Sequence, residues 1–113
     1  MAAGQLNILV EQGATFSRIL TVESTPGNPL DLTGYTFAGK MKKSFTDANA
    51  AATFSLTVTN AAIGEVTWVM TPQQTQALAP QVHRYDIEMT RTSTGVITRL
   101  LEGEAWVSAS ITN

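Results

Sequence analysis

Polar and apolar residues alternate along most of this chain, and a period of two is typical of β-strands with one buried face. Strands are predicted over 6–12 and 15–22, and Gly13 between them supplies the backbone freedom for a tight turn, so we expect an opening hairpin. On the second strand, the apolar register holds Phe16, Arg18, Leu20 and Val22.

The middle of the chain continues this pattern after a dense turn signal at 24–29. Leu30 and Leu32 are expected to anchor the following loop to the core. Further strands are predicted over 35–44, 52–60 and 65–71, and segment 45–51 is predicted as a loop. On the first of these strands, Lys40 and Lys42 fall on the face opposite the apolar residues.

One segment, 71–80, breaks the alternation and predicts a short helix. Thr71 is placed as N-cap, Pro72 at the first helical position and Gln74 three residues after the cap, which is a capping-box arrangement. Leu78 is expected to face inward. Strands over 82–91 and 95–108 then form a hairpin across "TSTG", with a bulge or bend expected at Gly103.

These elements together predict an all-β fold in a single domain, 1–113: an immunoglobulin-like β-sandwich of about seven antiparallel strands, with one short helix before the penultimate strand. Tyr85, two residues before Ile87, has the layout of a tyrosine corner. Ile87 is expected at the centre of the core. Either Trp68 or Trp106 is expected to pack near it, and the pattern does not choose between them.

The carboxylates of the last hairpin are the candidate chemistry. A three-residue loop with a left-handed Gly95 makes Asp86 face Glu102, whereas a four-residue loop makes Glu88 face Arg99. Two facing carboxylates can share a proton, hold a cation such as calcium, or serve a glycosidase. The alternative is a polar face that meets solvent or a partner, and period-two spacing produces such pairs without any purpose.

Composition narrows the function classes further. Charged residues make up 14% of the chain, against about 25% in an ordinary soluble domain, so much of the surface is expected to be covered by partners. The net charge of −2 gives no electrostatic footprint for nucleic acid. No stretch is apolar enough to span a membrane, and the start lacks a secretion signal, so synthesis in a cytoplasm is expected.

No cofactor or metal site is expected, because the chain has no cysteine and a single histidine, His83. His83 is expected near the surface at the start of a strand. Phosphate-binding glycine frames and a nucleophile elbow are also absent from the sequence, so no enzyme activity is expected. An Arg in an apolar register, such as Arg18, reaches past the sheet end, pairs with a carboxylate, or meets another subunit. The candidate interface residues are Arg18, Lys40, Lys42, Asp86 and Glu102.

Five stretches resemble a known protein class: "EQGATFSRILTV", "GNPLDLTGYTFAGKMKKS", "MTPQQTQAL", "HRYDIEMT" and "GVITRLLEGEAWVS". The chain resembles the small β-sandwich structural proteins of tailed bacteriophages, including the N-terminal domains of baseplate and tail-fibre attachment proteins. The recurring pieces are Gln12-Gly13, the segment 31–34 and Tyr85-Asp86. No catalytic motif comes with the resemblance.

The resemblance implies a non-enzymatic virion protein of the tail, baseplate, fibre attachment or head decoration. Its partners would be other virion proteins and further copies of itself, in a homo-oligomer such as a trimer or hexamer. It would be made in the host cytoplasm and reside in the virion. The alternative is a β-sandwich module that binds carbohydrate at a cell surface, which needs solvent-exposed aromatic side chains.

Overall fold

The computed structural model describes residues 4–44 and 49–111, and the expected all-β character is confirmed. The elements are β1 (Gly4–Gln5), β2 (Ile8–Glu11), β3 (Phe16–Thr21), β4 (Glu23–Thr25), β5 (Asn28–Pro29), β6 (Tyr35–Lys42), β7 (Ala52–Thr53), β8 (Ser55–Asn60), the 3-10 helix η1 (Ala61–Ile63), β9 (Glu65–Met70), α1 (Pro72–Gln76), β10 (Val82–Arg91) and β11 (Ile97–Ser108). Every strand of four or more residues falls on a predicted segment; β1, β4, β5 and β7 are shorter. Within the predicted loop 45–51, residues 45–48 lie outside the described residues.

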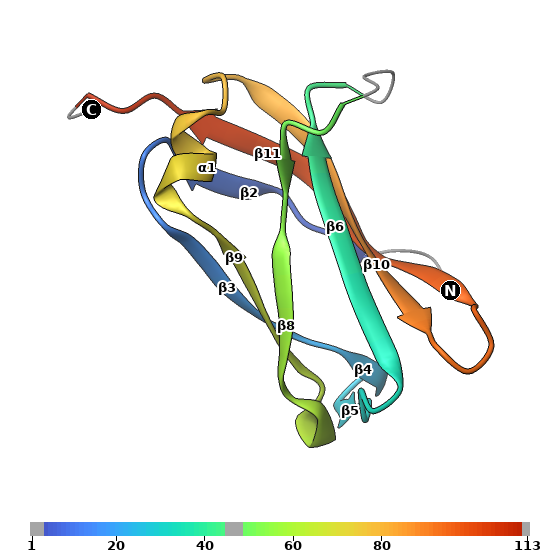
Figure 1. Cartoon of the computed structure of the whole chain (residues 1–113). Helices are drawn as coiled ribbons and strands as arrows, with labels where there is room; N and C mark the ends of the chain where they lie inside the picture. Colours follow the sequence, from blue (N-terminus) through green and yellow to red (C-terminus); the bar gives the residue numbers. More distant parts are fainter. Residues whose placement is uncertain (1–3, 45–48, 112–113) are drawn as a thin grey trace.

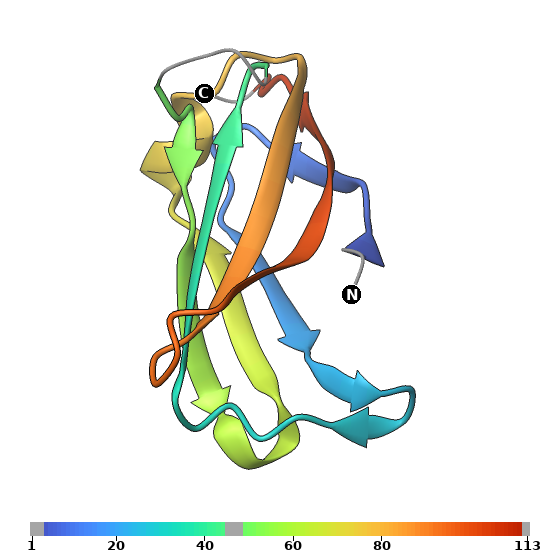
Figure 2. The same ribbon diagram turned by 90° about the vertical axis from the view of Figure 1, so that its right-hand side faces the viewer.

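Two sheets face each other across the core, with α1 at one end and the β4–β5 hairpin at the other (Figures 1 and 2). The six-stranded sheet has the order β1-β11-β10-β6-β7, and β2 also pairs with β11. The three-stranded sheet has the order β3-β9-β8. Both β1 and β2 run parallel to β11, so the expectation of wholly antiparallel pairing is wrong for the first strands.

The expected opening hairpin is also wrong, because β2 and β3 belong to different sheets. The chain crosses between the sheets at Gly13, whose φ of 82° is left-handed. Thr75 of α1 holds this crossing: its hydroxyl accepts a hydrogen bond from the Gly13 amide and donates one to the Ala14 carbonyl. The side chain of Gln12 donates to the Leu78 carbonyl. The "EQGAT" segment is therefore a docked crossover: it passes from one sheet to the other and is held by hydrogen bonds to Thr75 and Leu78. A local alternation pattern cannot reveal to which sheet each flanking strand belongs.

Aromatic rings from both sheets meet at the centre of the core. Trp68 of β9 is fully buried and lies in edge contact with Phe16 of β3 and Phe54, at ring-centroid distances of 5.1 and 5.0 Å. Tyr85 of β10 lies 5.3 Å from the same indole, so Trp68 is the tryptophan of the core. Ile87 is fully buried, as expected.

The short helix forms as its sequence predicts. The Thr71 hydroxyl accepts from the Gln74 amide, and the Gln74 side chain accepts from the Thr71 amide, which completes the capping box. Leu78, just after the helix, is 2% exposed and belongs to the core, as expected. Leu32 is buried as well, and half-buried Leu30 packs beside it.

The hairpin of β10 and β11 contains both of the alternative registers. Close to the turn Glu88 faces Arg99, as a four-residue loop requires, and Gly95 has a left-handed φ of 74°. A bulge between Ile87 and Glu88 then shifts the pairing by one residue, so Asp86 faces Glu102. The sequence predicts a bulge or bend at Gly103, but the bulge of this hairpin lies between Ile87 and Glu88 instead.

Gly103 has a different role, because the segment between β1 and β2 passes directly over it. A Cβ at this position would overlap the carbonyl oxygen of Leu6. The same carbonyl accepts a 2.6 Å hydrogen bond from the hydroxyl of Tyr85, which faces Gly103 across the strands. A tyrosine corner instead bonds the backbone a few residues upstream, so that expectation is wrong.

His83 is fully buried, which corrects the expectation of a surface position. It shares the inward register of β10 with Tyr85 and Ile87, and the alternation carries it into the core. Its Nδ1 lies 3.1 Å from the Gln81 carbonyl, and because a carbonyl only accepts, Nδ1 is the nitrogen that donates.

Candidate functional site

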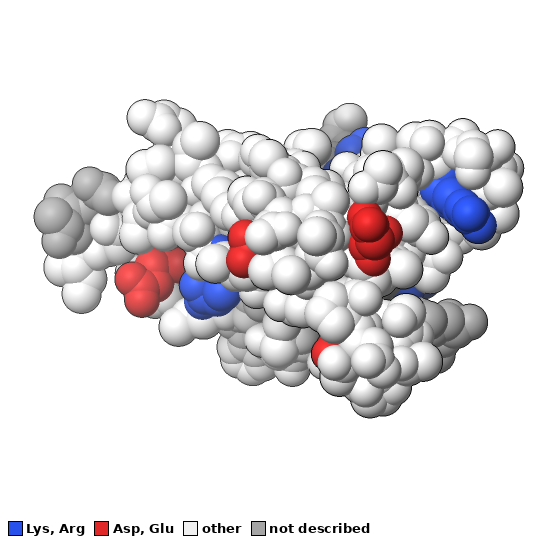
Figure 3. Space-filling model, turned by 90° about the horizontal axis from the view of Figure 1, so that it is seen from below, with Lys and Arg blue, Asp and Glu red and all other residues white. Residues whose placement is uncertain are grey.

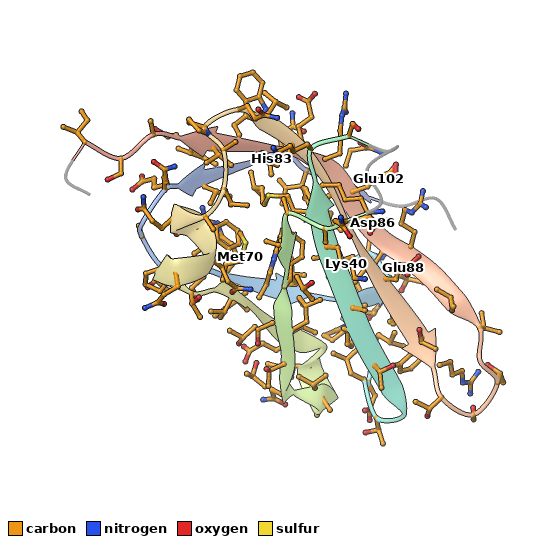
Figure 4. The ribbon with its side chains drawn as sticks, turned by 45° about the horizontal axis from the view of Figure 1, so that its top comes forward. Lys40, Met70, His83, Asp86, Glu88 and Glu102 are labelled. Carbon is orange, nitrogen blue, oxygen red and sulfur yellow. The ribbon has the colours of Figure 1, made fainter. Side chains whose placement is uncertain are left out.

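Four of the five candidate interface residues lie together on the outer face of the six-stranded sheet. Asp86 of β10 has Lys40 of β6 and Glu102 of β11 as its cross-strand neighbours. In the adjacent row, Lys42 of β6 lies beside Arg84. Figure 4 shows Lys40, Asp86, Glu88 and Glu102 gathered at the middle of this sheet, with His83 nearer one end.

Ion pairs within the face neutralise most of its carboxylates. Arg99 lies 3.3 Å from Asp86 and 3.6 Å from Glu102, so a guanidinium bridges the two facing carboxylates. Arg84 lies 3.3 Å from Glu104. The β10–β11 bulge makes the Arg99 bridge possible, because it places Arg99 one residue closer to this row. These side chains are substantially exposed, so each pair contributes little to stability.

This arrangement argues against a cation or a shared proton between Asp86 and Glu102, because Arg99 already supplies the positive charge. Among residues 4–44 and 49–111, no group of three or more metal-ligating side chains is close enough to hold a metal ion. A shallow hollow of about 450 Å³ lies over the face, between Lys40 and Lys42 on one side and Arg99 and Glu102 on the other. Its lining of mixed and partly paired charge suits a broad polar contact.

The fifth candidate, Arg18, lies apart on the three-stranded sheet. It is exposed on β3, one of the two edge strands of this sheet, and its guanidinium lies 4.7 Å from the centre of the Phe16 ring. Its Nη1 donates to the carbonyl of Ser17. Within the part of the chain that the structure describes, Arg18 forms no ion pair, so of its three predicted roles the pairing with a carboxylate is wrong.

An exposed apolar row adjoins the charged face, and the sequence analysis missed it. Leu9 of β2, Trp106 of β11 and Val82 of β10 are successive cross-strand neighbours. They are 54%, 52% and 37% exposed, respectively. An exposed tryptophan between two exposed aliphatic side chains is unusual on a soluble protein, because single exposed apolar residues are common but contiguous ones mark binding surfaces.

A signal for this row was present in the sequence. Leu9 stands between Ile8 and Val10, and Trp106 stands between Ala105 and Val107. In a strand with one buried face, three consecutive apolar residues place the middle one on the opposite face. Both triplets therefore predict an outward apolar side chain. What could not be predicted is that β2 and β11 are neighbours, because their parallel pairing joins distant parts of the chain.

Charge is sparse elsewhere on the surface as well. Seen from below, the molecule presents scattered charged side chains on a largely uncharged surface (Figure 3).

Among the described residues, no helix is both long enough and apolar enough to cross a membrane. The chain matches no protein-family model and no curated protein sequence.

Proposed function

We propose that this protein is a non-enzymatic structural protein of a tailed bacteriophage virion, and that it contributes to the tail, baseplate, fibre attachment or head decoration through protein–protein contacts. The observation that carries the proposal of protein contacts is the exposed row of Leu9, Trp106 and Val82. The resemblance of the five sequence stretches supports the virion as the place where those contacts are made.

The same proposal includes an immunoglobulin-like sandwich. This part of the proposal is supported by the strand order β11-β10-β6 on one sheet and β3-β9-β8 on the other, with β2 added along β11. The helical link α1 before β10 suits it too. Trp68 differs from the antibody pattern, because the buried tryptophan of antibody domains lies on the strand that corresponds to β6, whereas Trp68 lies on β9.

The segments that carry the resemblance have structural roles in this chain, and this supports the proposal of a structural protein. Gln12-Gly13 forms the docked crossover, and Tyr85 fastens the segment between β1 and β2. Asp31 accepts hydrogen bonds from the amide and the hydroxyl of Thr33, and these bonds lower the pKa of its carboxyl group. Residues of this kind preserve a framework while leaving the sheet faces available for contacts.

The test is the composition of virus particles. Tailed phage particles from the source of this sequence are purified on a density gradient, and their proteins are quantified by mass spectrometry. We expect the chain at a fixed ratio to the major tail protein, at several to many copies per particle. A chain that is absent from intact particles but abundant in the lysate would contradict the proposal.

One observation favours a second candidate, a carbohydrate-binding module: the exposed indole of Trp106, since aromatic faces stack on sugar rings. Host polysaccharide is titrated while tryptophan emission is followed. Because Trp68 is buried, a change would come from Trp106, and Trp106→Ala should abolish it. Unchanged emission at saturating polysaccharide would exclude stacking at this residue.

A further inference from the structure

We infer that the free edge of β3 accepts an extended segment of a partner protein, which adds to the three-stranded sheet as a further strand and places a carboxylate against Arg18. The inference rests on the proposed function only in that both require protein contacts. It adds which edge is used, which form the partner takes and which side chain the partner needs.

Within the described part of the chain, β3 is the longest edge strand of the two facing sheets that keeps a continuous register. β1 and β7 contain two residues each, and β2 contains four. β8 has six residues, as β3 has, but a bulge interrupts its pairing with β9. Short length, bulges, proline and charge are the usual features that keep an edge strand from pairing. Of these, β3 has only the charge of Arg18.

Alternate residues of β3 direct their backbone amide and carbonyl groups away from β9. The register pairs Thr21 with Glu65, and one step further the Val22 amide donates a 2.8 Å hydrogen bond to the Gly64 carbonyl. Because hydrogen-bonded residues alternate along an antiparallel strand, the even-numbered residues of β3 bond to β9 and the odd-numbered ones face the free edge. These free-edge residues are all exposed: Ser17, Ile19 and Thr21.

The Ser17 carbonyl supports this assignment of direction. It accepts a 3.0 Å hydrogen bond from Nη1 of Arg18, whose side chain thus lies against the free edge. The amides and carbonyls of the free-edge residues extend over about 14 Å, and no strand in the described part of the chain pairs with them. Another extended backbone matches such a row of donors and acceptors, so the occupant is a strand.

Arg18 indicates the chemistry of the partner. It lies between Phe16 and Leu20 in the inner register of β3, and within the described residues no carboxylate of its own chain pairs with it. The Cβ atom directly opposite Arg18 in an added strand is about 5 Å away. An Asp or Glu at that position forms an ion pair and draws the guanidinium away from the Ser17 carbonyl. The adjacent partner residue faces Ile19, which is 66% exposed, so an apolar side chain suits that position.

A folded second copy fits this edge less well than a single segment. The crossover at Gly13 joins β2 directly to β3, so these two strands lie on the same side of the sandwich, one in each sheet (Figure 1). A copy that paired its own β3 here would bring its own β2 to the same side. Antiparallel pairing of β3 with a second β3 also sets Phe16, Arg18 or Leu20 opposite Arg18, and none of these is a carboxylate.

The first test is NMR-detected hydrogen exchange of the full chain with a synthetic peptide of about eight residues. The peptide is acetylated and amidated, is built from Thr, Val and Ser, and carries Glu opposite Arg18 and Val opposite Ile19 in an antiparallel register. We expect a dissociation constant on the order of 100 μM. Peptide at about ten times that concentration should slow exchange of the Ser17, Ile19 and Thr21 amides about tenfold. The amides of Arg18 and Leu20, which already bond to β9, are the internal control and should not change.

Methylation of the peptide backbone distinguishes strand addition from other kinds of binding. A peptide methylated at an amide that faces β3 loses a hydrogen bond and should bind about tenfold more weakly. The same peptide methylated at the next amide, which faces away from β3, is the matched control and should bind within about twofold of the parent. Equal weakening by both methyl groups would overturn strand addition.

A charge exchange tests the role of Arg18. Arg18→Glu should weaken the Glu peptide about fivefold, and a peptide with Lys in place of Glu should bind this variant better than it binds the wild type. Arg91→Glu, at an exposed position on β10, is the matched control and should leave both affinities unchanged. Thermal melts verify that each variant is folded. Affinities that ignore the exchange would overturn the need for a carboxylate.

Free-edge amides that exchange at the same rate with and without several millimolar peptide would overturn the inference. So would slowing that grows with the concentration of the protein alone, because a second copy would then be the occupant. Neither result bears on the presence of the chain in virus particles. Conversely, strand addition by a chain that is absent from particles would uphold this inference and contradict the proposed function.

Discussion

The hydroxyl of Tyr85 donates a 2.6 Å hydrogen bond to the carbonyl of Leu6, 79 residues earlier in the chain. Leu6 lies between β1 and β2, so the bond fastens the first strands to the centre of the six-stranded sheet. Tyr85 is 4% exposed, and its ring also packs against Trp68. One side chain thus joins the aromatic core to the N-terminal edge of the sheet.

This burial should make the protein sensitive to alkaline pH. Desolvation raises the pKa of Tyr85 from 10.0 to about 12. Below pH 10 the phenol is neutral in both the folded and the unfolded chain, and its contribution to stability is fully present. Above pH 10 the unfolded chain loses the proton first, so the free energy of unfolding should fall between pH 10 and pH 12. Urea titrations at intervals across this range measure the fall.

Tyr85→Phe separates this effect from other alkaline titrations. Near pH 7 it should destabilise the protein by about 1 kcal/mol, because the Leu6 carbonyl loses its donor. Between pH 10 and pH 12 its stability should fall less steeply than that of the wild type. Equal slopes would show that Tyr85 does not titrate differently in the two states.

Gly103→Ala should be strongly destabilising. Its Cβ would overlap the Leu6 carbonyl oxygen, so the segment between β1 and β2 must shift and the bond to Tyr85 must break. We expect a loss of about 1–3 kcal/mol in a urea titration, the usual range for overpacking. Gly4→Ala is the matched control: its Cβ would meet Leu101 at 3.4 Å, which is tolerable, and it should change stability by less than about 0.5 kcal/mol.

Thr75→Val tests the crossover between the sheets. Valine has nearly the same shape but offers the Gly13 amide no acceptor and the Ala14 carbonyl no donor. Because Thr75 is fully buried, we expect a loss of about 1–3 kcal/mol by chemical denaturation. Thr57→Val, at an exposed position on β8, should change stability by no more than about 0.5 kcal/mol. Similar losses from both variants would argue against the role given to Thr75.

Ile87→Ala tests the position of the core. Removing a fully buried isoleucine side chain should lower the free energy of unfolding by about 2–5 kcal/mol. Ile97→Ala removes the same atoms from an exposed position on the neighbouring strand and should have little effect. A loss below about 1 kcal/mol for Ile87→Ala would contradict the placement of this residue.

The local pattern was sufficient to predict the strands and the helix cap, because both depend on neighbours in sequence. The alternation through 82–91 places Tyr85 and Ile87 inward whatever lies next to the strand. Thr71, Pro72 and Gln74 satisfy the start of a helix among themselves. His83 could also have been placed correctly, since it shares the inward register of Tyr85. The polarity of histidine favoured a surface position, but in the structure the strand register determines that this side chain is buried.

What could not be predicted depends on contacts between distant segments. The parallel pairing of β2 with β11 decides three features at once: the loss of the opening hairpin, the need for glycine at position 103 and the joining of Leu9 to Trp106. The bulge in β10 and β11 belongs to the same class. A single loop length predicts one register, whereas an extra residue within the hairpin allows both, and this is why Asp86 and Glu88 each find the partner predicted for them.

The parallel pairing of β1 and β2 with β11 also determines how the domain bears a load. If Gly4 and Ser108 are pulled apart, the paired strands are displaced along their length in opposite directions, and the hydrogen bonds between them are stretched together. In an antiparallel hairpin pulled at its open end, the bonds break one after another. Tension between these two positions is therefore shared among several hydrogen bonds at once, where the first strands lie against the last.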